Sequence, residues 1–316
     1  MAAMVYDLAI IGGGPAGAAA GVYAARKKLK TIFITKDWLG QSSVSDNIEN
    51  WIGTTKITGM ELSQSLEKHV KTYADGVIEI KEGEICKNIE KSTSPTSPSG
   101  SFSIQTDKTW YEAKSILIVS GSHRKKIDTM GADKFEHKGL TYCATCDGPL
   151  YTGQDVVVIG GGNAAFDSAA QLMAYCKTVT ILNRSENFRA DPGTVEVVKK
   201  NPNIKIITSA IPTEIKGDKF VSSIVYTNSK TNKTHEIKTA GIFVEIGSLP
   251  NTDFAKNVVT LDEFNRIPVD ARNQQTKTKG IWAAGDCTDG LYHQNNIAAG
   301  DAVKAIEDIY LHLKAK

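Results

Sequence analysis

The sequence predicts an α/β protein with two Rossmann-like dinucleotide-binding domains. Three observations lead to this prediction. A buried-strand pattern, a glycine-rich turn and a helical stretch follow one another at residues 8–27, and the same succession returns at residues 155–175. Between the two copies lies the segment Cys143-Ala-Thr-Cys146-Asp147. A strand, a glycine turn and a helix in this order form the cradle that holds the pyrophosphate of a dinucleotide.

The first glycine-rich turn follows the apolar run 8–11, and a second apolar run comes after the helical stretch, at residues 31–35. Its three spaced glycines permit a tight turn, an approach of backbone N–H groups to a pyrophosphate, and close packing of the helix on the strand. A proline is tolerated in the first helical turn, where its missing N–H would have no partner. We therefore expect one dinucleotide to bind at Gly12, Gly14, Pro15, Ala16 and Gly17.

The second glycine-rich turn lies between the apolar runs 155–159 and 178–182. An alanine takes the third glycine position, and its small side chain still allows the helix to pack closely on the strand. One such turn alone is weak evidence, but two copies, each between a buried strand and a helix, predict two bound dinucleotides. The second dinucleotide is expected at Gly160, Gly162, Asn163, Ala164 and Ala165.

Length, charge and hydropathy restrict the function further. The 316 residues correspond to roughly two domains. The 37 basic and 35 acidic residues leave a net charge of +2 and form no basic block, so we expect no nucleic-acid partner. The apolar runs are shorter than the roughly 18 residues of a membrane span, and the N-terminus shows no leader pattern. We therefore expect no membrane partner and a cytoplasmic protein.

The cysteine pattern favours a redox-active pair. Five cysteines are too few, and odd in number, for a structural disulfide framework. Cys143 and Cys146 are close enough in sequence to form a disulfide, and the neighbouring Asp147 can exchange the proton that thiolate chemistry requires. One Cys-x-x-Cys pair cannot complete a four-ligand zinc site, and we expect no metal. The three isolated cysteines are expected to be buried: Cys86, Cys176 and Cys287.

In this order, the motifs are similar to those of the low-molecular-weight thioredoxin reductases and of the flavoprotein portion of alkyl hydroperoxide reductase. The resemblance covers nearly the whole chain. It implies a class II pyridine nucleotide-disulfide oxidoreductase fold. FAD would bind a discontinuous domain, residues 1–120 and 247–316, and NAD(P)H would bind residues 121–246, which carry the cysteine pair. The matching segments are residues 47–51, 143–148, 241–247, 249–252 and 280–287.

The resemblance also implies which residues contact FAD outside the first glycine-rich turn. Gln41 and Asn50 would face the flavin, Asp286 would bind the ribitol, and the turn 293–295 would meet the pyrimidine end of the ring. The family usually has an acidic residue for the adenosine ribose where this chain has Lys36, and the adjacent Asp37 can substitute for it. The implied contacts are Lys36, Asp37, Gln41, Asn50, Gly121, Gly285, Asp286, His293, Gln294 and Asn295.

The second dinucleotide is predicted to be NADPH, with NADH left open. Thioredoxin reductases carry a His-Arg-Arg-x-x-x-Arg pattern where the 2′-phosphate is recognised, and this chain has Asn183-Arg184-Ser185 followed by Arg189 there. We expect Asn183, Arg184 and Arg189 to contact the nucleotide, and the two arginines favour a 2′-phosphate. An acid at position 183 would favour NADH and is absent, although Glu186 lies nearby.

By this resemblance, the protein is an enzyme that passes electrons from NADPH to flavin, then to the Cys143–Cys146 disulfide, and finally to a thioredoxin-like protein. Cys146 would react with the flavin, Cys143 would attack the partner disulfide, and Asp147 would serve as acid and base. The resemblance further implies a homodimer and a rotation between the two domains. Three alternatives stay open: NADH-dependent reduction of a peroxiredoxin or glutaredoxin-like protein, oxidation of a dithiol by FAD, and non-catalytic nucleotide sensing.

Overall fold

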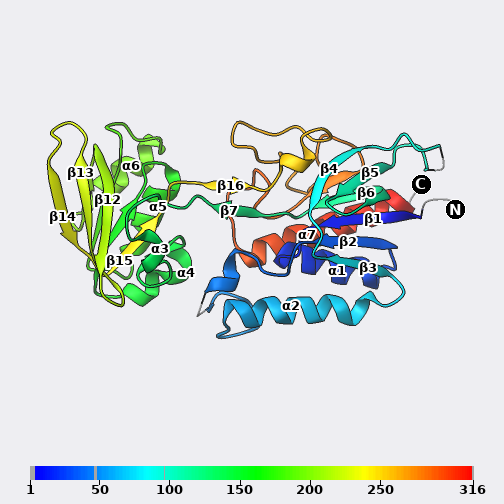
Figure 1. Cartoon of the computed structure of the whole chain (residues 1–316), viewed down its shortest axis with the longest axis horizontal. Helices are drawn as coiled ribbons and strands as arrows, with labels where there is room; N and C mark the ends of the chain where they lie inside the picture. The colour runs from blue at the N-terminus through cyan, green and yellow to red at the C-terminus, as the bar shows by residue number, and fades with distance from the viewer. Residues whose placement is uncertain (1–3, 46–47, 96, 315–316) are drawn as a thin grey trace. The chain divides into compact units, whose positions relative to one another are not determined.

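The computed structural model describes residues 4–45, 48–95 and 97–314 of the chain. Residue contacts divide the chain into two compact units, unit 1 with residues 1–123 and 249–316 and unit 2 with residues 124–248 (Figure 1). Asn47, which belongs to one of the segments that carry the family resemblance, lies outside the described residues. Within the described ranges, no helix is both long and apolar enough to cross a membrane. The assignment of the two units to FAD and to a nicotinamide nucleotide stays a prediction.

Unit 1 is built around a mixed sheet with the strand order β3-β2-β1-β6-β5-β4, in which β17 also pairs with β6. The pairs among β3, β2, β1, β6 and β17 are parallel, whereas β5 is antiparallel to both of its neighbours. The strands are β1 (Val5–Ile11), β2 (Thr31–Thr35), β3 (Ile78–Glu82), β4 (Cys86–Lys91), β5 (Phe102–Thr106), β6 (Trp110–Ile118) and β17 (Ile281–Ala283). The helices are α1 (Pro15–Arg26), α2 (Gly59–Ala74), α7 (Asn295–Lys314) and the short η1 (Gln41–Val44) and η3 (Asp253–Ala255).

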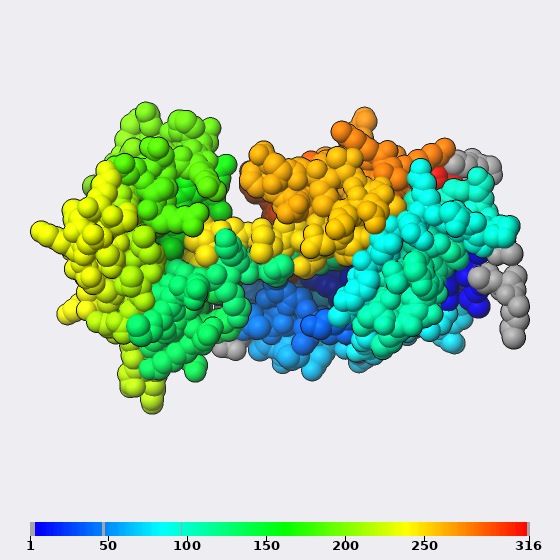
Figure 2. All heavy atoms as spheres, turned by 45° about the horizontal axis from the view of Figure 1, so that its top comes forward, coloured from blue at the N-terminus to red at the C-terminus, as the bar shows by residue number. Residues whose placement is uncertain are grey.

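Alternation along β1 gives each face of this sheet its own core. Leu8 and Ile10 pack on one face with α1, α2 and α7, whereas Ala9 and Ile11 pack on the other. Apolar residues of the irregular segment 254–269, yellow to orange in Figure 2, cover this second face. Parallel strands require such cover on both faces. The packing fixes the carboxyl end of β1, from which the first glycine-rich turn leads into α1.

Unit 2 contains a five-stranded sheet with the order β11-β10-β9-β15-β8, and all of its strand pairs are parallel. A second sheet, β12-β13-β14, is antiparallel. The strands are β8 (Leu140–Thr141), β9 (Asp155–Ile159), β10 (Thr178–Leu182), β11 (Ile204–Ile207), β12 (Ala210–Gly217), β13 (Val221–Asn228), β14 (Thr234–Lys238) and β15 (Gly241–Val244). The helices are α3 (Ala132–Phe135), α4 (Ala144–Asp147), α5 (Asn163–Leu172), α6 (Pro192–Lys199) and the short η2 (Gly148–Tyr151).

The parallel sheet of unit 2 is also covered on both faces. Val156 and Val158 of β9 pack with α5 and α6, and Val157 and Ile159 pack with the antiparallel sheet. The chain passes between the units through β7 (Ser122–Arg124) and β16 (Ser248–Pro250), which pair with each other. Each unit thus contains the predicted succession of strand, glycine turn, helix and parallel strand. The predicted α/β class with two Rossmann-like units is confirmed.

Candidate functional site

The first glycine-rich turn, between β1 and α1, leaves a cradle for a phosphate. A Cβ atom on Gly12, whose φ is +126°, would lie closer than 3.0 Å to the carbonyl oxygen of Val119, and one on Gly17 would be equally close to that of Gly12. A Cβ on Gly14 would instead meet nothing within 4 Å. α1 begins at Pro15, and among the described side chains none caps this helix. The backbone N–H groups of its first turn are therefore left for an anion.

The N-terminus of α7 lies close to the same cradle. A Cβ on Gly285, which has a φ of +75°, would lie 3.1 Å from the Cβ of Ala298 in α7 and 3.5 Å from that of Ala16 in α1. The beginnings of both helices therefore converge on Gly285. Two convergent positive helix ends suit a ligand with negative charge at two points, as FAD has at its pyrophosphate and, once reduced, at its ring.

Gln41, Asp286 and His293 form a polar group in unit 1. The Nε2 of Gln41 donates to Oδ2 of Asp286 (3.2 Å) and to Oγ of Ser122 (3.1 Å). The Nδ1 of His293 lies 3.9 Å from Oδ1 of Asp286, and its Nε2 lies 2.8 Å from the carbonyl oxygen of Gly290. The structure thus brings Gln41 together with Asp286 and His293, more than 240 positions later in the chain, and the resemblance assigns all three to one cofactor.

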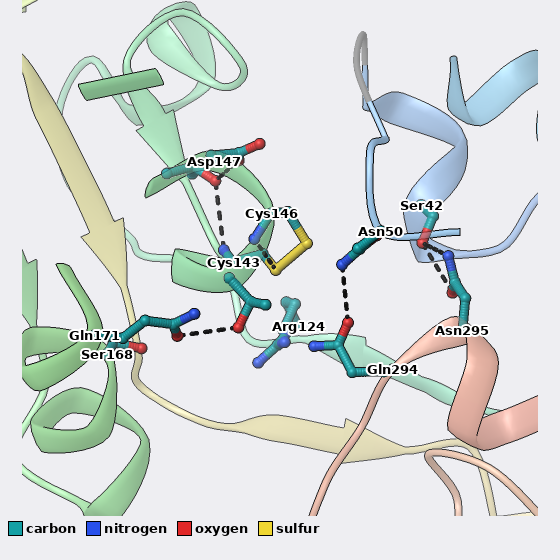
Figure 3. Close-up of a disulfide and its surroundings, with 12 residues drawn as sticks. Ser42, Asn50, Arg124, Cys143, Cys146, Asp147, Ser168, Gln171, Gln294 and Asn295 are labelled. Atoms are coloured by element: carbon teal, nitrogen blue, oxygen red, sulfur yellow. Dashed lines mark hydrogen bonds between the residues drawn. A yellow bond between two sulfur atoms is a disulfide. The ribbon is translucent and has the colours of Figure 1, made fainter. Parts of the chain in front are cut away.

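A second polar group joins the N-terminus of α7 to the segment before α2. The Nδ2 of Asn50 donates to Oε1 of Gln294 (3.2 Å), and the Nδ2 of Asn295 donates to Oγ of Ser42 (3.0 Å; Figure 3). The Nδ2 of Asn296 also donates to the carbonyl oxygen of Asn50 (2.6 Å). Asn50, predicted to face the flavin, and Gln294, predicted to meet the pyrimidine end of its ring, are therefore directly hydrogen-bonded in unit 1, and Asn295 lies beside them.

Lys36 and Asp37 follow β2 and border the first cradle. Lys36 is exposed, and Oδ1 of Asp37 accepts a hydrogen bond from the N–H of Leu39 (2.9 Å). A Cβ on Gly13 would lie closer than 3.0 Å to the carbonyl oxygen of Asp37, so the residue after Lys36 lies directly against the glycine turn. Gly121 follows β6 with a φ of +63°. Asp37 therefore lies beside the first cradle, one residue after the position where the resemblance expects the acid that binds the adenosine ribose, and its role stays a prediction.

The second glycine-rich turn, in unit 2, repeats the geometry of the first. A Cβ on Gly160 would lie closer than 3.0 Å to the carbonyl oxygen of Glu245, whereas one on Gly162 would meet nothing within 4 Å. Among the side chains that the structure describes, none caps the start of α5. This turn therefore offers a second cradle for a phosphate. The other predicted residues of the turn form the beginning of α5: Asn163, Ala164 and Ala165.

Asn183 organises the loop 183–189, which follows β10. Its side chain is only 3% exposed, and its Nδ2 donates to the carbonyl oxygens of Ser185 (2.9 Å) and Asn187 (3.1 Å). The Asn183 amide is therefore engaged by carbonyl groups of its own loop, and its contact with the nucleotide stays a prediction. An asparagine side chain readily bonds nearby backbone groups, and here it turns inward and holds the shape of the loop.

The two arginines of the same loop are exposed. The N–H of Arg189 donates to the carbonyl oxygen of Gly161 (2.8 Å), which ties the loop to the second glycine turn. Glu186, the acid near this position, forms an ion pair with Lys230 from the turn between β13 and β14. The second cradle is thus bordered by Arg184, Arg189 and an acid that already has a cationic partner.

Cys143 and Cys146 form a disulfide just after β8 (Figure 3). Their Cα atoms are 5.3 Å apart. Cys143 is the residue before α4, and its Sγ accepts a hydrogen bond from the N–H of Cys146 (3.2 Å). Asp147 ends α4, and its carboxylate accepts a hydrogen bond from the hydroxyl of Thr141 in β8. The predicted disulfide and its acidic neighbour therefore share one short turn of the chain, with Cys143 half-buried and Cys146 exposed.

The isolated cysteines are buried, as predicted, and none of them forms a disulfide. Burial raises the pKa of Cys86 to about 12 and that of Cys176 and Cys287 to about 11. A thiol with so high a pKa is protonated at neutral pH and is a poor nucleophile. Within the described ranges, no three histidine, cysteine or acidic side chains gather as metal ligands.

Sequence reasoning missed Glu245, which follows β15. This residue is 8% exposed, and its Oε1 accepts a hydrogen bond from Oγ of Ser168 in α5 (2.8 Å). Its Oε2 lies 3.8 Å from Nη1 of Arg124 in β7. Burial raises the pKa of Glu245 to about 7, although Arg124 and Ser168 act to lower it. The available signal was a single acid within an otherwise apolar strand sequence, residues 241–246.

These features of unit 2 lie along one edge because the strands of its large sheet are parallel. The loop 183–189 follows β10, the glycine turn follows β9, Glu245 follows β15, and the disulfide follows β8. These four strands are successive neighbours in the sheet. The order along the edge is therefore arginine loop, phosphate cradle, buried acid and disulfide.

Comparison with known proteins gives one family for nearly the whole chain. A family model for pyridine nucleotide-disulphide oxidoreductases matches residues 6–302. The F subunit of alkyl hydroperoxide reductase from Pseudomonas putida is 36% identical over 310 residues, which are 98% of this chain and 58% of that protein. A protein named NADH dehydrogenase from Bacillus subtilis is 33% identical over 301 residues, 95% of this chain and 57% of that protein. The chain thus spans little more than half the length of these two relatives.

A solved structure extends the comparison to three dimensions. Thioredoxin reductase from Giardia duodenalis is 32% identical and has a TM-score of 0.89, and the match covers 99% of both chains. Both resemblances seen in the sequence, to thioredoxin reductases and to the alkyl hydroperoxide reductase flavoprotein, are confirmed.

The two open glycine positions give a pair of matched substitutions. We predict that Gly14→Ala keeps the fold but weakens FAD binding, because a methyl group fits there yet occupies the open side of the cradle. One lost hydrogen bond to a charged group costs about 1.5–3 kcal/mol, roughly tenfold or more in affinity. Gly162→Ala should retain FAD and weaken nicotinamide nucleotide binding to a similar degree. Flavin content and nucleotide titration measure the two effects, and a Gly14→Ala variant that binds FAD as tightly as the unsubstituted chain would contradict the assignment.

Proposed function

Because the chain belongs to the pyridine nucleotide-disulphide oxidoreductase family, we propose that it is an FAD-dependent, NADPH-dependent thioredoxin-disulfide reductase. Electrons would pass from NADPH through the flavin and the Cys143–Cys146 disulfide to a thioredoxin-like protein. FAD and a pyridine nucleotide are the cofactors of this family. The observation that carries the proposal is the disulfide on the same sheet edge as the second phosphate cradle.

Unit 1 is proposed to bind FAD. The open side of Gly14 and the uncapped start of α1 suit the pyrophosphate, and the start of α7 suits the ring. The linked side chains of Gln41 and Asp286 offer hydrogen-bonding groups for the ribitol and the ring. When bound there, FAD supplies the two-electron carrier between a nicotinamide and a disulfide.

Unit 2 is proposed to bind NADPH. A 2′-phosphate is best recognised by guanidinium groups, and Arg184 and Arg189 are exposed on the loop that is tied to the cradle. The carboxylate of Glu186, which would repel a phosphate, is paired with Lys230. Both observations support NADPH over NADH.

Transfer to the partner protein is proposed to occur by thiol–disulfide exchange. The Cys143 thiolate attacks one sulfur of the partner disulfide, a mixed disulfide forms, and the partner's other sulfur leaves and takes a proton. Cys146 then attacks Cys143, which restores the Cys143–Cys146 disulfide and releases the partner as a dithiol. The N–H of Cys146, which donates to Sγ of Cys143, would stabilise the attacking thiolate. Asp147, one residue beyond Cys146, is proposed to move the protons.

A second candidate function is NADH-dependent reduction of a peroxiredoxin or glutaredoxin-like protein. The relatives named alkyl hydroperoxide reductase and NADH dehydrogenase favour it. The chemistry at Cys143 and Cys146 would be the same, and only the nucleotide and the partner would differ. A dithiol oxidase is less well supported, because it would have no use for the second phosphate cradle. We further propose, from the resemblance alone, that the protein is a homodimer of the cytoplasm.

We predict that the two loop arginines determine the preference for NADPH. In Arg184→Ala and Arg189→Ala, the KM for NADPH should rise by about tenfold or more, because a charged hydrogen bond contributes about 1.5–3 kcal/mol. The KM for NADH should change little. Anaerobic flavin reduction with both nucleotides measures the effect, and Lys205→Ala, an exposed cation of β11, is the control. Equal changes for NADPH and NADH in the arginine variants would refute recognition of the 2′-phosphate by these residues.

The exchange step predicts that two serine variants differ in one respect, the accumulation of a mixed disulfide with thioredoxin. Cys146→Ser and Cys143→Ser should both keep flavin reduction by NADPH and lose turnover of a thioredoxin disulfide. Only Cys146→Ser should accumulate a mixed disulfide with thioredoxin, because it keeps the attacking thiol and lacks the resolving one. Non-reducing electrophoresis and mass spectrometry detect this species. Retained turnover in Cys146→Ser would refute the disulfide pathway, and a mixed disulfide found only in Cys143→Ser would reverse the two assigned roles.

A further inference from the structure

Glu245 is a buried acid that the proposed electron path does not use. The four residues before it, Gly241–Val244, form a fully buried strand. Burying a carboxyl group costs free energy unless polar partners compensate. Glu245 has the Ser168 hydroxyl at 2.8 Å and the half-exposed Arg124 guanidinium at 3.8 Å, a distance beyond direct hydrogen bonding. An apolar side chain at this position would avoid the free-energy cost of burying a carboxyl group, so the presence of Glu245 calls for a functional explanation.

Glu245 directly follows a strand beside the reversal of the strand order in unit 2. The strand order of unit 2 reverses at β9, with β10 on one side and β15 on the other. Dinucleotides bind across such a reversal, with the adenosine ribose on the side of the strand that follows the glycine turn. That strand is β10, which carries the arginine loop. The nicotinamide half is therefore expected on the side of β15, which ends directly before Glu245.

Two further observations place Glu245 between the cradle and the disulfide along the sheet edge. Its carbonyl oxygen lies so close to Gly160 that no Cβ would fit there. On the other side of β15, Phe243 is in register with Thr141 of β8, whose hydroxyl donates to Asp147 beside the disulfide. A nicotinamide that extends from the cradle along this edge would meet the surroundings of Glu245 before those of the disulfide.

We propose that Glu245 is a specificity-determining residue for the nicotinamide half of the dinucleotide, at which an ionised carboxylate favours the positively charged oxidised ring over the uncharged reduced ring. This inference rests on the proposed binding of a nicotinamide nucleotide by unit 2. The charged groups that face Glu245 are Arg124 of β7 and Asp167 of α5. When Glu245 is ionised it offsets the charge of Arg124, and when it is protonated that positive charge is left to oppose a cationic ring.

The sign of the pH dependence follows from the raised pKa. Because burial raises the pKa of Glu245 to about 7, the side chain is mainly protonated at pH 6 and mainly ionised at pH 8. Affinity for the oxidised nucleotide, relative to one with an uncharged ring, should therefore rise across this interval. If the bound cationic ring lowers the pKa of Glu245 by one unit, this relative affinity rises by about tenfold in total.

Calorimetric binding to the FAD-loaded full chain tests the inference without relying on turnover. The probes are NADP⁺ and its tetrahydro analogue, which has the same phosphates, an uncharged ring and no hydride to donate. The ratio of their dissociation constants, measured from pH 6 to pH 8, cancels the titration of the 2′-phosphate. We expect this ratio to change about tenfold in the unsubstituted chain and to be independent of pH in Glu245→Gln. Glu236→Gln, an exposed position of β14 in the same unit, should behave like the unsubstituted chain.

Ser168→Ala provides a second variant if Glu245→Gln does not fold. Its hydrogen bond lowers the pKa of Glu245, so its removal should move the midpoint of the ratio to higher pH. Three results would overturn the role of Glu245 and leave the proposed function intact. The first is a ratio that does not vary with pH although the unsubstituted chain binds both probes. The others are an unchanged pH dependence in Glu245→Gln and an unmoved midpoint in Ser168→Ala. If the unsubstituted chain binds neither probe, the proposed function is overturned as well.

Discussion

The parallel direction of the strands in unit 2 is the constraint on which its proposed chemistry depends. Carboxyl ends of parallel strands meet at one edge of a sheet, and ligands of such sheets bind at that edge. In unit 2 the edge carries the arginine loop, the phosphate cradle, Glu245 and the disulfide, in the order of their strands. Segments that are about a hundred residues apart in the chain are thereby aligned along one edge of the sheet.

Unit 1 follows the same rule with a different outcome. Its parallel strands bring the first glycine turn to the carboxyl end of β1, and Gly285 brings the starts of α1 and α7 together there. Neither Cys143 nor Cys146 belongs to this unit. The side chains that the resemblance assigns to the flavin there include amides, His293 and Asp286, and several of them contact one another. One fold is therefore proposed to serve two purposes, in unit 1 as a holder for FAD and in unit 2 as a holder for a nucleotide beside the disulfide.

The glycine turns and the cysteine pair could be predicted because backbone geometry or covalent chemistry demands those residue types. Gly12 and Gly160 each lie against a carbonyl oxygen of another segment, and this contact leaves no room for a Cβ atom at either position. The direction in which a side chain points could not be predicted in the same way. Asn183 occupies the expected loop position, but its amide is consumed by carbonyl groups of that loop. Its inward orientation depends on the path of the whole loop, which no local pattern encodes.

Glu245 illustrates the same difficulty in the opposite direction. In sequence it is a single acid within the apolar segment 241–246, a pattern that marks the residue but does not show which partners compensate its burial. Its burial follows from the packing of α5 and from Arg124, more than a hundred residues earlier in the chain. The short strand β8, only two residues long, was also beyond sequence patterns, yet it sets the disulfide beside β15. Long-range packing thus decides which polar residues join the site.

Electrons are proposed to leave this protein through the Cys143–Cys146 disulfide. The most direct test is anaerobic reduction of the FAD-loaded chain with NADPH, followed by alkylation and mass spectrometry of each cysteine under native conditions. We expect a bleached flavin and new alkylation at Cys143 and Cys146, with the buried Cys86, Cys176 and Cys287 unmodified. A flavin that is fully reduced by NADPH while Cys143 and Cys146 stay disulfide-bonded would contradict it.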